Sequence, residues 1–421
     1  MDIYDWDLSP PRSPAIGDHD VPSLSSHLAG RRVALLVSGG IAAMKTPLLA
    51  RALRRRGADV VAFCSEEALR YVGRQALEWA TCHEVVTTLT WRAEHLSDAN
   101  PFDLYLVAPA TYNTIGKVAS GIADTVVTAA LASALGRLRE GRATVMMAPT
   151  MHGSMHTDVL VRSCRALSDL GVRLLAPRDD YGKHNLPDDE TIVAAACRAL
   201  SASPLRGRKV LVTGGPTPVP IDRVRRIVNR FRGRLGAALT EDLLLRGADV
   251  TFVLGDGAWK PPAWVPVQVA PTYDDYKRLV LEHVNRGLDA GVFSAGVADY
   301  RPRVAVDGKI ESGAASLTLE LEPTEKVIEM ARDADPGLFM VTFKYLEHAS
   351  LEALLEEARR RLDRYPVVVA NRGAETHGNE QTAWIVTRDG ETRVEDKEAI
   401  AGAICDALER QLPRGGSSGV G

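Results

Sequence analysis

The sequence predicts an α/β protein with two Rossmann-like domains, each a mostly parallel sheet with helices on both faces. Two stretches, 31–40 and 208–215, begin alike with a basic pair, a short apolar run and a pair of glycines. Each is followed by a segment of helical length that ends in Gly-Ala-Asp, at 57–59 and 247–249, and leads into another apolar run. Short buried strands that alternate with helix-length segments form parallel sheets, because crossover helices must connect them.

Further apolar runs extend both expected sheets in chain order. They are Leu104–Val107 and Thr144–Met147 in the first domain, and Val292–Ser294, Phe339–Phe343 and Val367–Ala370 in the second. Ligands of doubly wound sheets collect beyond the carboxyl ends of the strands. The residues that follow these runs are therefore the candidate site residues.

The length of the chain also favours two domains, since 421 residues exceed what one hydrophobic core usually organises. We expect a disordered extension at 1–28, a first domain at 29–200, a linker at 201–207, a second domain at 208–412 and a flexible tail at 413–421. Small residues and a proline interrupt the apolar pattern at the linker. Both ends of the chain are rich in Pro, Ser or Gly.

Composition argues against nucleic-acid and membrane partners. The formal net charge is −3, and the Arg-rich stretches 51–56 and 359–364 are interpreted as solvated helix faces. No window approaches the roughly eighteen apolar residues of a membrane span, and the first 28 residues lack the pattern of a secretory signal. The five cysteines have no CxxC spacing, which fits a cytoplasmic location better than a disulfide framework.

The first glycine turn is a candidate phosphate site. Ser38-Gly39-Gly40 links a strand to a helix, and its glycines allow backbone N–H groups to approach a phosphate. Ser65 follows the next strand and adds a hydroxyl group. Such turns also occur in α/β proteins that bind nothing there, so this segment alone leaves both interpretations open.

A longer motif follows the run at 104–107. The segment Pro109–Asp124 reads Pro-Ala-Thr-Tyr-Asn-Thr-Ile-Gly-Lys-Val-Ala-Ser-Gly-Ile-Ala-Asp, and it resembles the signature of the flavoprotein family of cysteine decarboxylases. The resemblance implies FMN as the cofactor. The cofactor-binding residues that it implies, together with the glycine turn, are Ser38, Gly39, Gly40, Ser65, Ala110, Thr111, Asn113 and Thr114.

The segment Ala148–His156 resembles the substrate motif of the same family, with His152 in place of Asn and His156 in place of Trp, as in an archaeal-like variant. Met151 and His152 are therefore expected to bind the substrate. Two histidines four residues apart can also suggest a metal site, but no third ligand is evident.

His95 matches the position of the family's catalytic histidine, although a lone histidine is more often a surface or core residue. The resemblance implies that FMN oxidises the cysteinyl thiol of the substrate, that CO2 is lost, and that the electrons return, with His95 managing protons. Bacterial members also use a cysteine in a flexible clamp. The corresponding stretch, 180–187, has none, and Lys183 or His184 is expected to contact the substrate's carboxylate or phosphate instead.

The second domain resembles a phosphopantothenate–cysteine ligase. Residues 214–229 keep the Ile-Asp-x-Val-Arg-x-Ile-x-Asn core of that family, but Phe231–Gly236 reads Phe-Arg-Gly-Arg-Leu-Gly where the family has Ser-Ser-Gly-x-x-Gly. Ser294–Pro302, which reads Ser-Ala-Gly-Val-Ala-Asp-Tyr-Arg-Pro, matches the family's Ala-Ala-Val-Ala-Asp-Tyr. The nucleotide-binding residues that the resemblance implies are Gly215, Asp222, Gly233, Gly236, Ala295, Asp299, Phe343 and Lys344.

Three residues of this domain are expected to act in the transfer of a nucleotidyl group from CTP, or from ATP, to the substrate carboxylate. Lys309 would neutralise charge on the phosphate, Asn229 would hold the acyl nucleotide, and Asp299 would position substrate or bind Mg²⁺. Lys309 can also be a solvated loop lysine.

Together, the resemblances cover both domains and identify the chain as a member of the bifunctional decarboxylase/ligase family of coenzyme A biosynthesis. The implied substrates are 4'-phosphopantothenate, cysteine and a nucleoside triphosphate, and the implied assembly is a homo-oligomer. The altered loop at 231–236 leaves a ligase-impaired second domain as an alternative. The absent clamp cysteine leaves a non-catalytic flavoprotein subunit as another.

Overall fold

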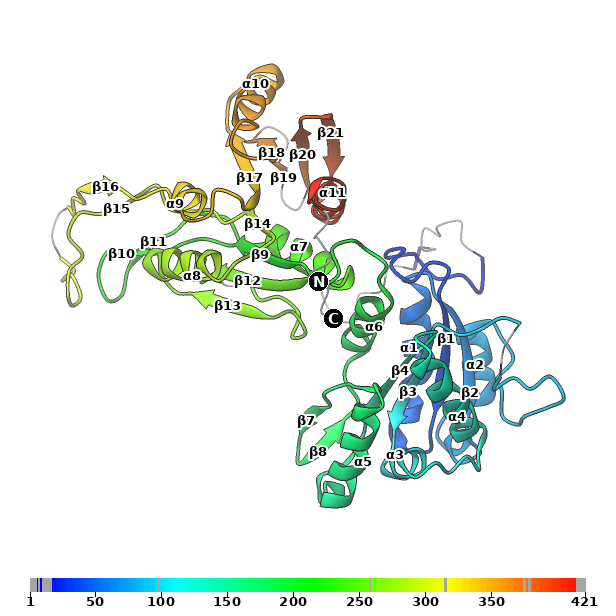
Figure 1. Cartoon of the computed structure of the whole chain (residues 1–421). Coiled ribbons are helices and arrows are strands. Elements are labelled where there is room, and N and C mark those ends of the chain that lie inside the picture. The colour runs from blue at the N-terminus through cyan, green and yellow to red at the C-terminus, as the bar shows by residue number, and fades with distance from the viewer. Residues whose placement is uncertain are drawn as a thin grey trace. The chain divides into compact units, whose positions relative to one another are not determined.

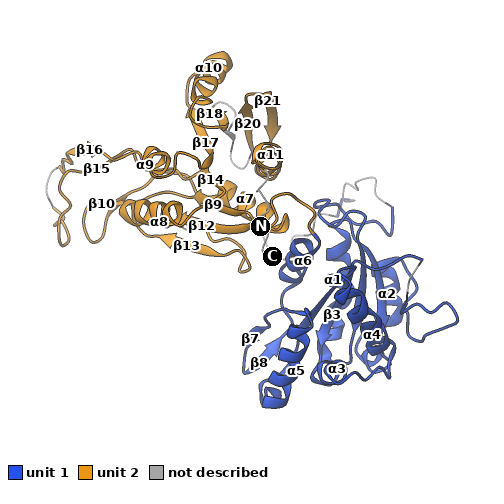
Figure 2. Ribbon diagram, in the orientation of Figure 1, with its two compact units in different colours: residues 1–200 blue, residues 201–421 orange. Residues whose placement is uncertain are grey.

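The structure is a computed structural model that describes residues 6, 8–9, 17–96, 99–257, 259–313, 316–373, 376–377 and 380–413. The chain forms two compact units, Met1–Leu200 and Ser201–Gly421 (Figure 2). Each unit contains its own sheet and its own core (Figure 1). The predicted α/β class with two mostly parallel sheets is confirmed.

The main sheet of the first unit has the strand order β2-β1-β3-β4-β6, and each neighbouring pair is parallel. Its strands are β1 (Arg32–Val37), β2 (Asp59–Cys64), β3 (Leu104–Ala110), β4 (Thr144–Pro149) and β6 (Arg173–Leu174). A smaller antiparallel sheet, β5-β8-β7, consists of β5 (Met151–His152), β7 (Arg178–Asp180) and β8 (Lys183–Asn185). The segments predicted to form the first site directly follow the carboxyl ends of these main strands.

Helices cover both faces of this sheet. One core cluster joins alternate residues of β1 and β3, such as Ala34 and Tyr105, to α4 and α5, while Val33 and Leu35 are buried on the other face. The helices are α1 (Thr46–Arg54), α2 (Arg74–Thr81), α3 (Tyr112–Ala119), α4 (Val126–Arg139), α5 (Asp158–Asp169) and α6 (Asp189–Leu200), with short 3-10 turns η1 (Ile41–Lys45), η2 (Ala68–Arg70) and η3 (Gly153–Met155).

The main sheet of the second unit has the order β13-β12-β9-β14-β17-β18-β20-β19, with β21 paired to β20. It is parallel from β13 to β18 and antiparallel beyond β18. Its strands are β9 (Lys209–Gly214), β12 (Asp249–Gly255), β13 (Val267–Ala270), β14 (Ala290–Phe293), β17 (Phe339–Leu346), β18 (Val367–Arg372), β19 (Thr376–His377), β20 (Glu380–Thr387) and β21 (Gly390–Glu395).

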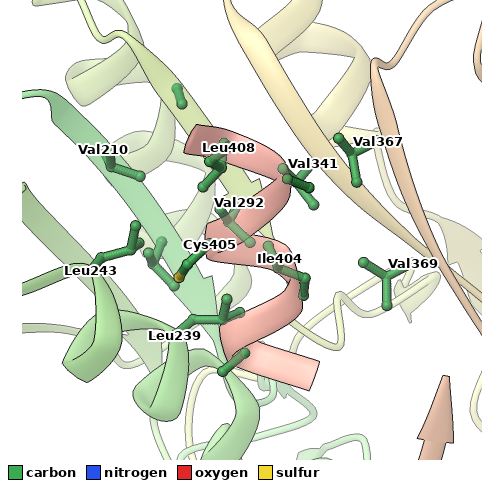
Figure 3. Packing of buried hydrophobic residues seen from close by; sticks show 14 of the residues in the cluster. Val210, Leu239, Leu243, Val292, Val341, Val367, Val369, Ile404, Cys405 and Leu408 are labelled. Carbon is green, nitrogen blue, oxygen red and sulfur yellow. The ribbon is translucent and has the colours of Figure 1, made fainter. Parts of the chain in front are cut away.

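Two core clusters, one on each face, hold the helices of the second unit against this sheet. Figure 3 shows one of them, in which valines of the strands lie opposite Ile404, Cys405 and Leu408 of α11. The helices are α7 (Arg234–Leu245), α8 (Tyr273–Asn285), α9 (Val327–Ala334), α10 (Leu351–Arg361) and α11 (Lys397–Gln411). Two short antiparallel pairs, β10 (Val219–Pro220) with β11 (Arg226–Ile227) and β15 (Tyr300–Pro302) with β16 (Leu321–Pro323), complete the unit.

The predicted extensions at the two ends differ in how far they can be compared with the structure. Residues 414–421 of the expected tail, and most of residues 1–16, lie outside the described residues. Leu24 and Leu28 donate backbone hydrogen bonds to Arg55 and Arg56, each 2.8 Å long, and Leu28 is buried. The last residues of the expected extension are thus fixed to the end of α1, a contact that their Pro- and Ser-rich sequence does not predict.

Candidate functional site

The carboxyl ends of β1 and β3 bring the first candidate residues together. The Ser38 hydroxyl is buried and donates a hydrogen bond to the Pro109 carbonyl at 2.7 Å. The Thr111 N–H donates to the same hydroxyl at 3.3 Å. Thr111 is also the N-cap of α3, where its Oγ1 accepts from the Thr114 N–H. Ser38 therefore forms one polar cluster at the sheet edge with Thr111 and Thr114, although it lies more than 70 positions before them in the sequence.

The glycine turn beside this cluster has no room for a side chain at Gly39 and little room at Gly40. A Cβ atom at Gly39 would lie 2.4 Å from Cγ of Glu67, and one at Gly40 would lie 3.2 Å from Cγ2 of Thr111. Ser65 joins the same edge, because its N–H donates to the Val37 carbonyl at 3.1 Å. Two bare glycines flanked by hydroxyl groups suit an anionic, phosphate-bearing cofactor.

Ala110 and Asn113 occupy opposite environments at this edge. Ala110 is fully buried at the end of β3, and its carbonyl accepts a hydrogen bond of 3.0 Å from the Thr150 N–H. Asn113 is exposed on the first turn of α3. The backbone hydrogen bond between Ala110 and Thr150 therefore places the predicted cofactor residues beside the predicted substrate segment.

The predicted substrate residues lie on the small sheet. Met151 is buried and pairs with His184, while the exposed His152 pairs with the exposed Lys183. His152 and Ser154 are linked through Nδ1 and Oγ at 2.8 Å. The structure thus brings Met151, His152 and Lys183 together, next to Ala110.

His95 does not join this group. The carbonyl of its neighbour Leu96 accepts a hydrogen bond from Arg137 near the end of α4, and the Asn100 carbonyl accepts one from Arg32, the first residue of β1. These contacts hold the turn toward the amino end of a sheet whose six-residue strand β1 spans about 20 Å. Nδ1 of His95 is buried and has no hydrogen-bond partner among the described residues. Within one copy of the chain, His95 therefore lies away from the Ser38–Thr111 edge.

In the second unit, four glycines form the centre of the candidate nucleotide site. Gly215 and Gly233 both have positive φ, of 74° and 83°. A Cβ at Gly233 would lie 2.8 Å from the Gly215 nitrogen, and one at Gly236 would lie 3.1 Å from the Gly214 Cα. Gly233 is the N-cap residue of α7 and has no side chain with which to cap that helix. The close backbone approach at the start of a helix suits a phosphate.

Asn229 and Ala295 connect this turn to the end of β14. The Asn229 amide donates to the carbonyls of Gly296 and Val297 at 2.9 and 3.1 Å. The Ala295 N–H donates to Thr213 Oγ1 at 3.3 Å, and the Gly296 N–H donates to the Gly215 carbonyl at 2.9 Å. Asn229 therefore orders the loop that carries Ala295.

The altered loop is accommodated by a contact that the sequence analysis missed. The Phe231 ring lies against Gly296, where an added Cβ would come within 2.6 Å of the ring, and it meets Tyr345 edge to face at 6.3 Å. The resemblance compares Phe231 with a serine and the Gly296 region with Ala-Ala. The sequence signal for this contact was a pair of departures from the family pattern, a larger residue at Phe231 and a smaller one at Gly296.

Asp222 is enclosed by the backbone. Its carboxylate accepts hydrogen bonds from the N–H groups of Val224, Arg225 and Ile310 at 2.6–3.0 Å and from the Arg225 guanidinium at 2.6 Å. Burial raises the pKa of Asp222, but these donors outweigh it and lower the pKa to about 2. The Ile310 contact positions the exposed Lys309, its neighbour in the chain. The geometry thus gives Asp222 a positioning role.

A cavity of about 440 Å³ opens beside β14 and β17 and includes Ala295, Asp299 and Phe343 in its lining. The Asp299 carboxylate is paired with Lys326 at 2.6 Å. The cations that line it are Lys326, Arg360, Arg361 and Arg364. Lys344 is outside this set and lies 3.6 Å from Glu357. The carboxylates Asp299, Glu325 and Glu329 line the cavity as well, and a cavity with charged groups of both signs and apolar walls suits a nucleotide bound with a cation.

Two kinds of site are not seen in the described part of the chain. No group of three or more His, Cys, Asp or Glu side chains there is arranged to hold a metal ion by itself. Nor does any helix among those residues have the length and apolar character required to span a membrane.

Comparison with known proteins gives matches over both units. The Flavoprotein family model matches residues 22–201, and the DNA/pantothenate metabolism flavoprotein C-terminal domain model matches residues 205–412. The chain is 36% identical over 399 residues to the coenzyme A biosynthesis bifunctional protein CoaBC of Thermococcus kodakarensis, covering 92% of this chain and 97% of the relative.

Two solved structures are similar to one part of the chain each. The DNA/pantothenate metabolism flavoprotein from Streptococcus pneumoniae is 25% identical, with a TM-score of 0.45, over 48% of this chain and 99% of the other. The FMN-dependent cysteine decarboxylase SpaF is 26% identical, with a TM-score of 0.36, over 41% of this chain and 99% of the other.

Proposed function

The chain belongs to the CoaBC family of bifunctional coenzyme A biosynthesis proteins, and we propose that its two units divide the family's two activities between them. The protein is an enzyme that joins 4'-phosphopantothenate to cysteine with a nucleotide and then decarboxylates the product to 4'-phosphopantetheine with FMN. Decarboxylation is assigned to 29–200 and ligation to 208–412. The observation that carries this conclusion is the match to a bifunctional relative over 97% of that relative's length. Neither a ligase-impaired protein nor a non-catalytic subunit is favoured.

Residues at the carboxyl ends of β1 and β3 in the first unit would hold FMN. When bound, FMN supplies the reversible oxidation of the thiol-bearing carbon of the substrate. The backbone of Gly39 and Gly40 and the hydroxyls of Ser65 and Thr111 would hold the phosphate. The exposed Asn113 would contact the ring, and the buried Ala110 and Thr114 would form the layer behind it. The buried Ser38 would stabilise this edge through its hydrogen bond to the Pro109 carbonyl.

The substrate of this unit would lie along β5. Met151 provides an apolar wall, and His152 with Lys183 offers polar and cationic groups for the carboxylate or phosphate. Thr150, which precedes Met151, donates a backbone hydrogen bond to Ala110. The substrate thiol would therefore meet the cofactor at the end of β3.

The second unit would bind CTP or ATP with Mg²⁺. Gly215, Gly233 and Gly236 would cradle phosphates at the start of α7, with Arg232 supplying charge. Lys309 would neutralise the transferring phosphate, and Asn229 and Ala295 would contact the acyl nucleotide. Phe343 would line the base pocket, and Lys344 would add charge near it. Mg²⁺ would bind Asp299 together with phosphate oxygens and water.

The location of His95 supports a homo-oligomer. A proton-handling role requires His95 at a cofactor edge, yet its turn is held at the other end of its own sheet. A second copy of the chain would supply such an edge. A cytoplasmic location is supported by the five cysteines, all of which are free thiols.

The purified protein is expected to be yellow and to release FMN on denaturation. The Ser38–Thr111 cluster and the glycine turn lie at the same sheet edge, so one cofactor can contact both. Absorption spectra and chromatography of the released flavin measure this. A colourless protein that does not take up added FMN would contradict the cofactor assignment.

His95→Asn is expected to lower decarboxylation by on the order of a hundredfold and to leave FMN bound, because a proton-handling group can be lost without losing the pocket. Turnover, flavin content and the size of the oligomer are measured together. Unchanged turnover would remove His95 from the mechanism.

The whole assignment is tested by a coupled assay with 4'-phosphopantothenate, cysteine, FMN, Mg²⁺ and either CTP or ATP. We expect 4'-phosphopantothenoylcysteine to form first and 4'-phosphopantetheine to follow, each detected separately. If neither nucleotide supports formation of the first product, the ligase assignment is wrong.

A further inference from the structure

Asp179, His184 and His156, in the small sheet and its adjoining turn, form a hydrogen-bonded triad to which the proposed function assigns no role. Nδ1 of His156 and Nε2 of His184 are 2.8 Å apart, and Nδ1 of His184 lies 2.6 Å from Oδ1 of Asp179. The His184 side chain is only 20% exposed, whereas that of Asp179 is 70% exposed. His156, at the other end of the triad, is also exposed.

This triad lies next to both the proposed substrate strand β5 and the proposed cofactor edge. His184 pairs directly with Met151 of β5, the strand assigned to the substrate. His156 precedes Thr157, whose hydroxyl is 3.3 Å from the Tyr112 hydroxyl, and Tyr112 directly follows Thr111 of the cofactor cluster. The Gly153 N–H donates to the Gly182 carbonyl at 2.9 Å and fixes the two turns to each other.

When His184 is neutral, the hydrogen bonds have one consistent direction. The Asp179 carboxylate can only accept, so Nδ1–H of His184 donates to it. Neutral His184 then has an unprotonated Nε2, which accepts from Nδ1–H of His156. This arrangement orients His156, and no partner for its Nε2 is seen among the described residues. A carboxylate and a histidine that orient a second histidine are arranged to support proton transfer.

The decarboxylation requires one proton at carbon. The bond between the carboxylate and the adjacent carbon breaks and CO2 leaves. The electron pair of the broken bond stays on that carbon, in conjugation with the sulfur. A C–H bond then forms at the same carbon. The two electrons taken from the thiol-bearing carbon at the start are returned at the end, so the reaction is redox neutral overall and consumes one proton.

Resting on the proposed function, we propose that His156 donates this proton from Nε2 and that His184 and Asp179 are its positioning residues. After the transfer, neutral His156 still donates from Nδ1 to His184, so no other hydrogen bond has to change. The stretch 180–187, which lacks the clamp cysteine, thus contributes His184 as the residue that positions the acid His156. The three side chains are bonded to one another, and within the described residues they are not among any cluster that could hold a metal ion.

The test uses the full chain loaded with FMN and the variants His156→Gln, His184→Gln and Asp179→Ala. With His156→Gln, 4'-phosphopantothenoylcysteine should bleach the visible flavin absorbance and release about one CO2 per flavin. Formation of 4'-phosphopantetheine and recovery of the absorbance should then slow by on the order of a hundredfold. His184→Gln and Asp179→Ala should show the same pattern with a loss of about tenfold, because they act through His156.

The matched control is His83→Gln, which removes a histidine paired with Asp59 at 2.5 Å at the first residue of β2, in the same unit. It should leave every step unchanged. A readout independent of the cofactor is ¹⁵N NMR of the histidine side chains in flavin-free protein. His184 should be in the Nδ1–H form in the wild type, and Asp179→Ala should shift it toward a mixture of tautomers.

Two results would overturn the inference while wild-type turnover is normal. One is unchanged product formation in His156→Gln, and the other is a parallel loss of bleaching, CO2 release and product, which indicates only a structural role. If the wild-type protein with FMN does not decarboxylate its substrate, the proposed function fails and this inference fails with it.

Discussion

Lys309→Gln is expected to lower the rate of ligation about a hundredfold and to leave decarboxylation unchanged. Lys309 is exposed, on a loop whose neighbour Ile310 is held by the buried Asp222 carboxylate at 3.0 Å. A positioned cation that stabilises charge in the transition state is worth about 3 kcal/mol, which corresponds to roughly two orders of magnitude in rate. Glutamine keeps the length and polarity of the side chain but removes the charge.

The control is Arg303→Gln, which removes a positive charge from the same segment of the chain. Arg303 is exposed and paired with Glu320 at 2.8 Å, outside the residues that line the cavity. Both variants are assayed for formation of 4'-phosphopantothenoylcysteine at saturating nucleotide. If Lys309→Gln ligates at the wild-type rate, Lys309 is a solvated loop residue and the phosphate must be neutralised by another cation.

Much of the fold could be predicted because its signals are local. Each buried strand is a short run of apolar residues, and the helix-length segments between them require parallel pairing. That rule also placed Ser38 and Thr111 near each other, since both directly follow strands whose carboxyl ends share an edge. Their hydrogen bond joins residues 73 positions apart and needs no local pattern of its own.

The contacts that could not be predicted all depend on which side chains meet across the fold. Phe231 against Gly296 and His156 against His184 have no periodic signature, because the two partners of each pair lie in different segments of the chain. The motif at 214–229 predicts nucleotide contact for Asp222, but a motif does not distinguish a carboxylate that meets a ligand from one that holds a loop. The position of His95 in the chain likewise does not reveal which end of the sheet it occupies.

The second large effect is expected for Gly233→Ala, which should lower the free energy of unfolding of the second unit by about 2–5 kcal/mol. Gly233 has φ of 83°, where a residue with a Cβ is strained by roughly 1–2 kcal/mol. In addition, the new methyl group would lie 2.6 Å from Leu254 Cδ1 and 2.8 Å from the backbone nitrogen of Gly215. Overpacking of this kind typically costs about 1–3 kcal/mol more.

Gly287→Ala separates these two contributions. Gly287 lies in the same unit with nearly the same φ, 81°, but a Cβ there would meet nothing within 4 Å. It should therefore show only the backbone cost of roughly 1–2 kcal/mol and ligate normally. Gly233→Ala should also lose ligation by on the order of a hundredfold, because the clash displaces the Gly215 N–H that is proposed to face a phosphate. Thermal unfolding and ligation rates are compared for both variants, with decarboxylation as the internal reference. Equal stability and equal ligation in the two would mean that close approach of the glycines plays no part in the nucleotide site.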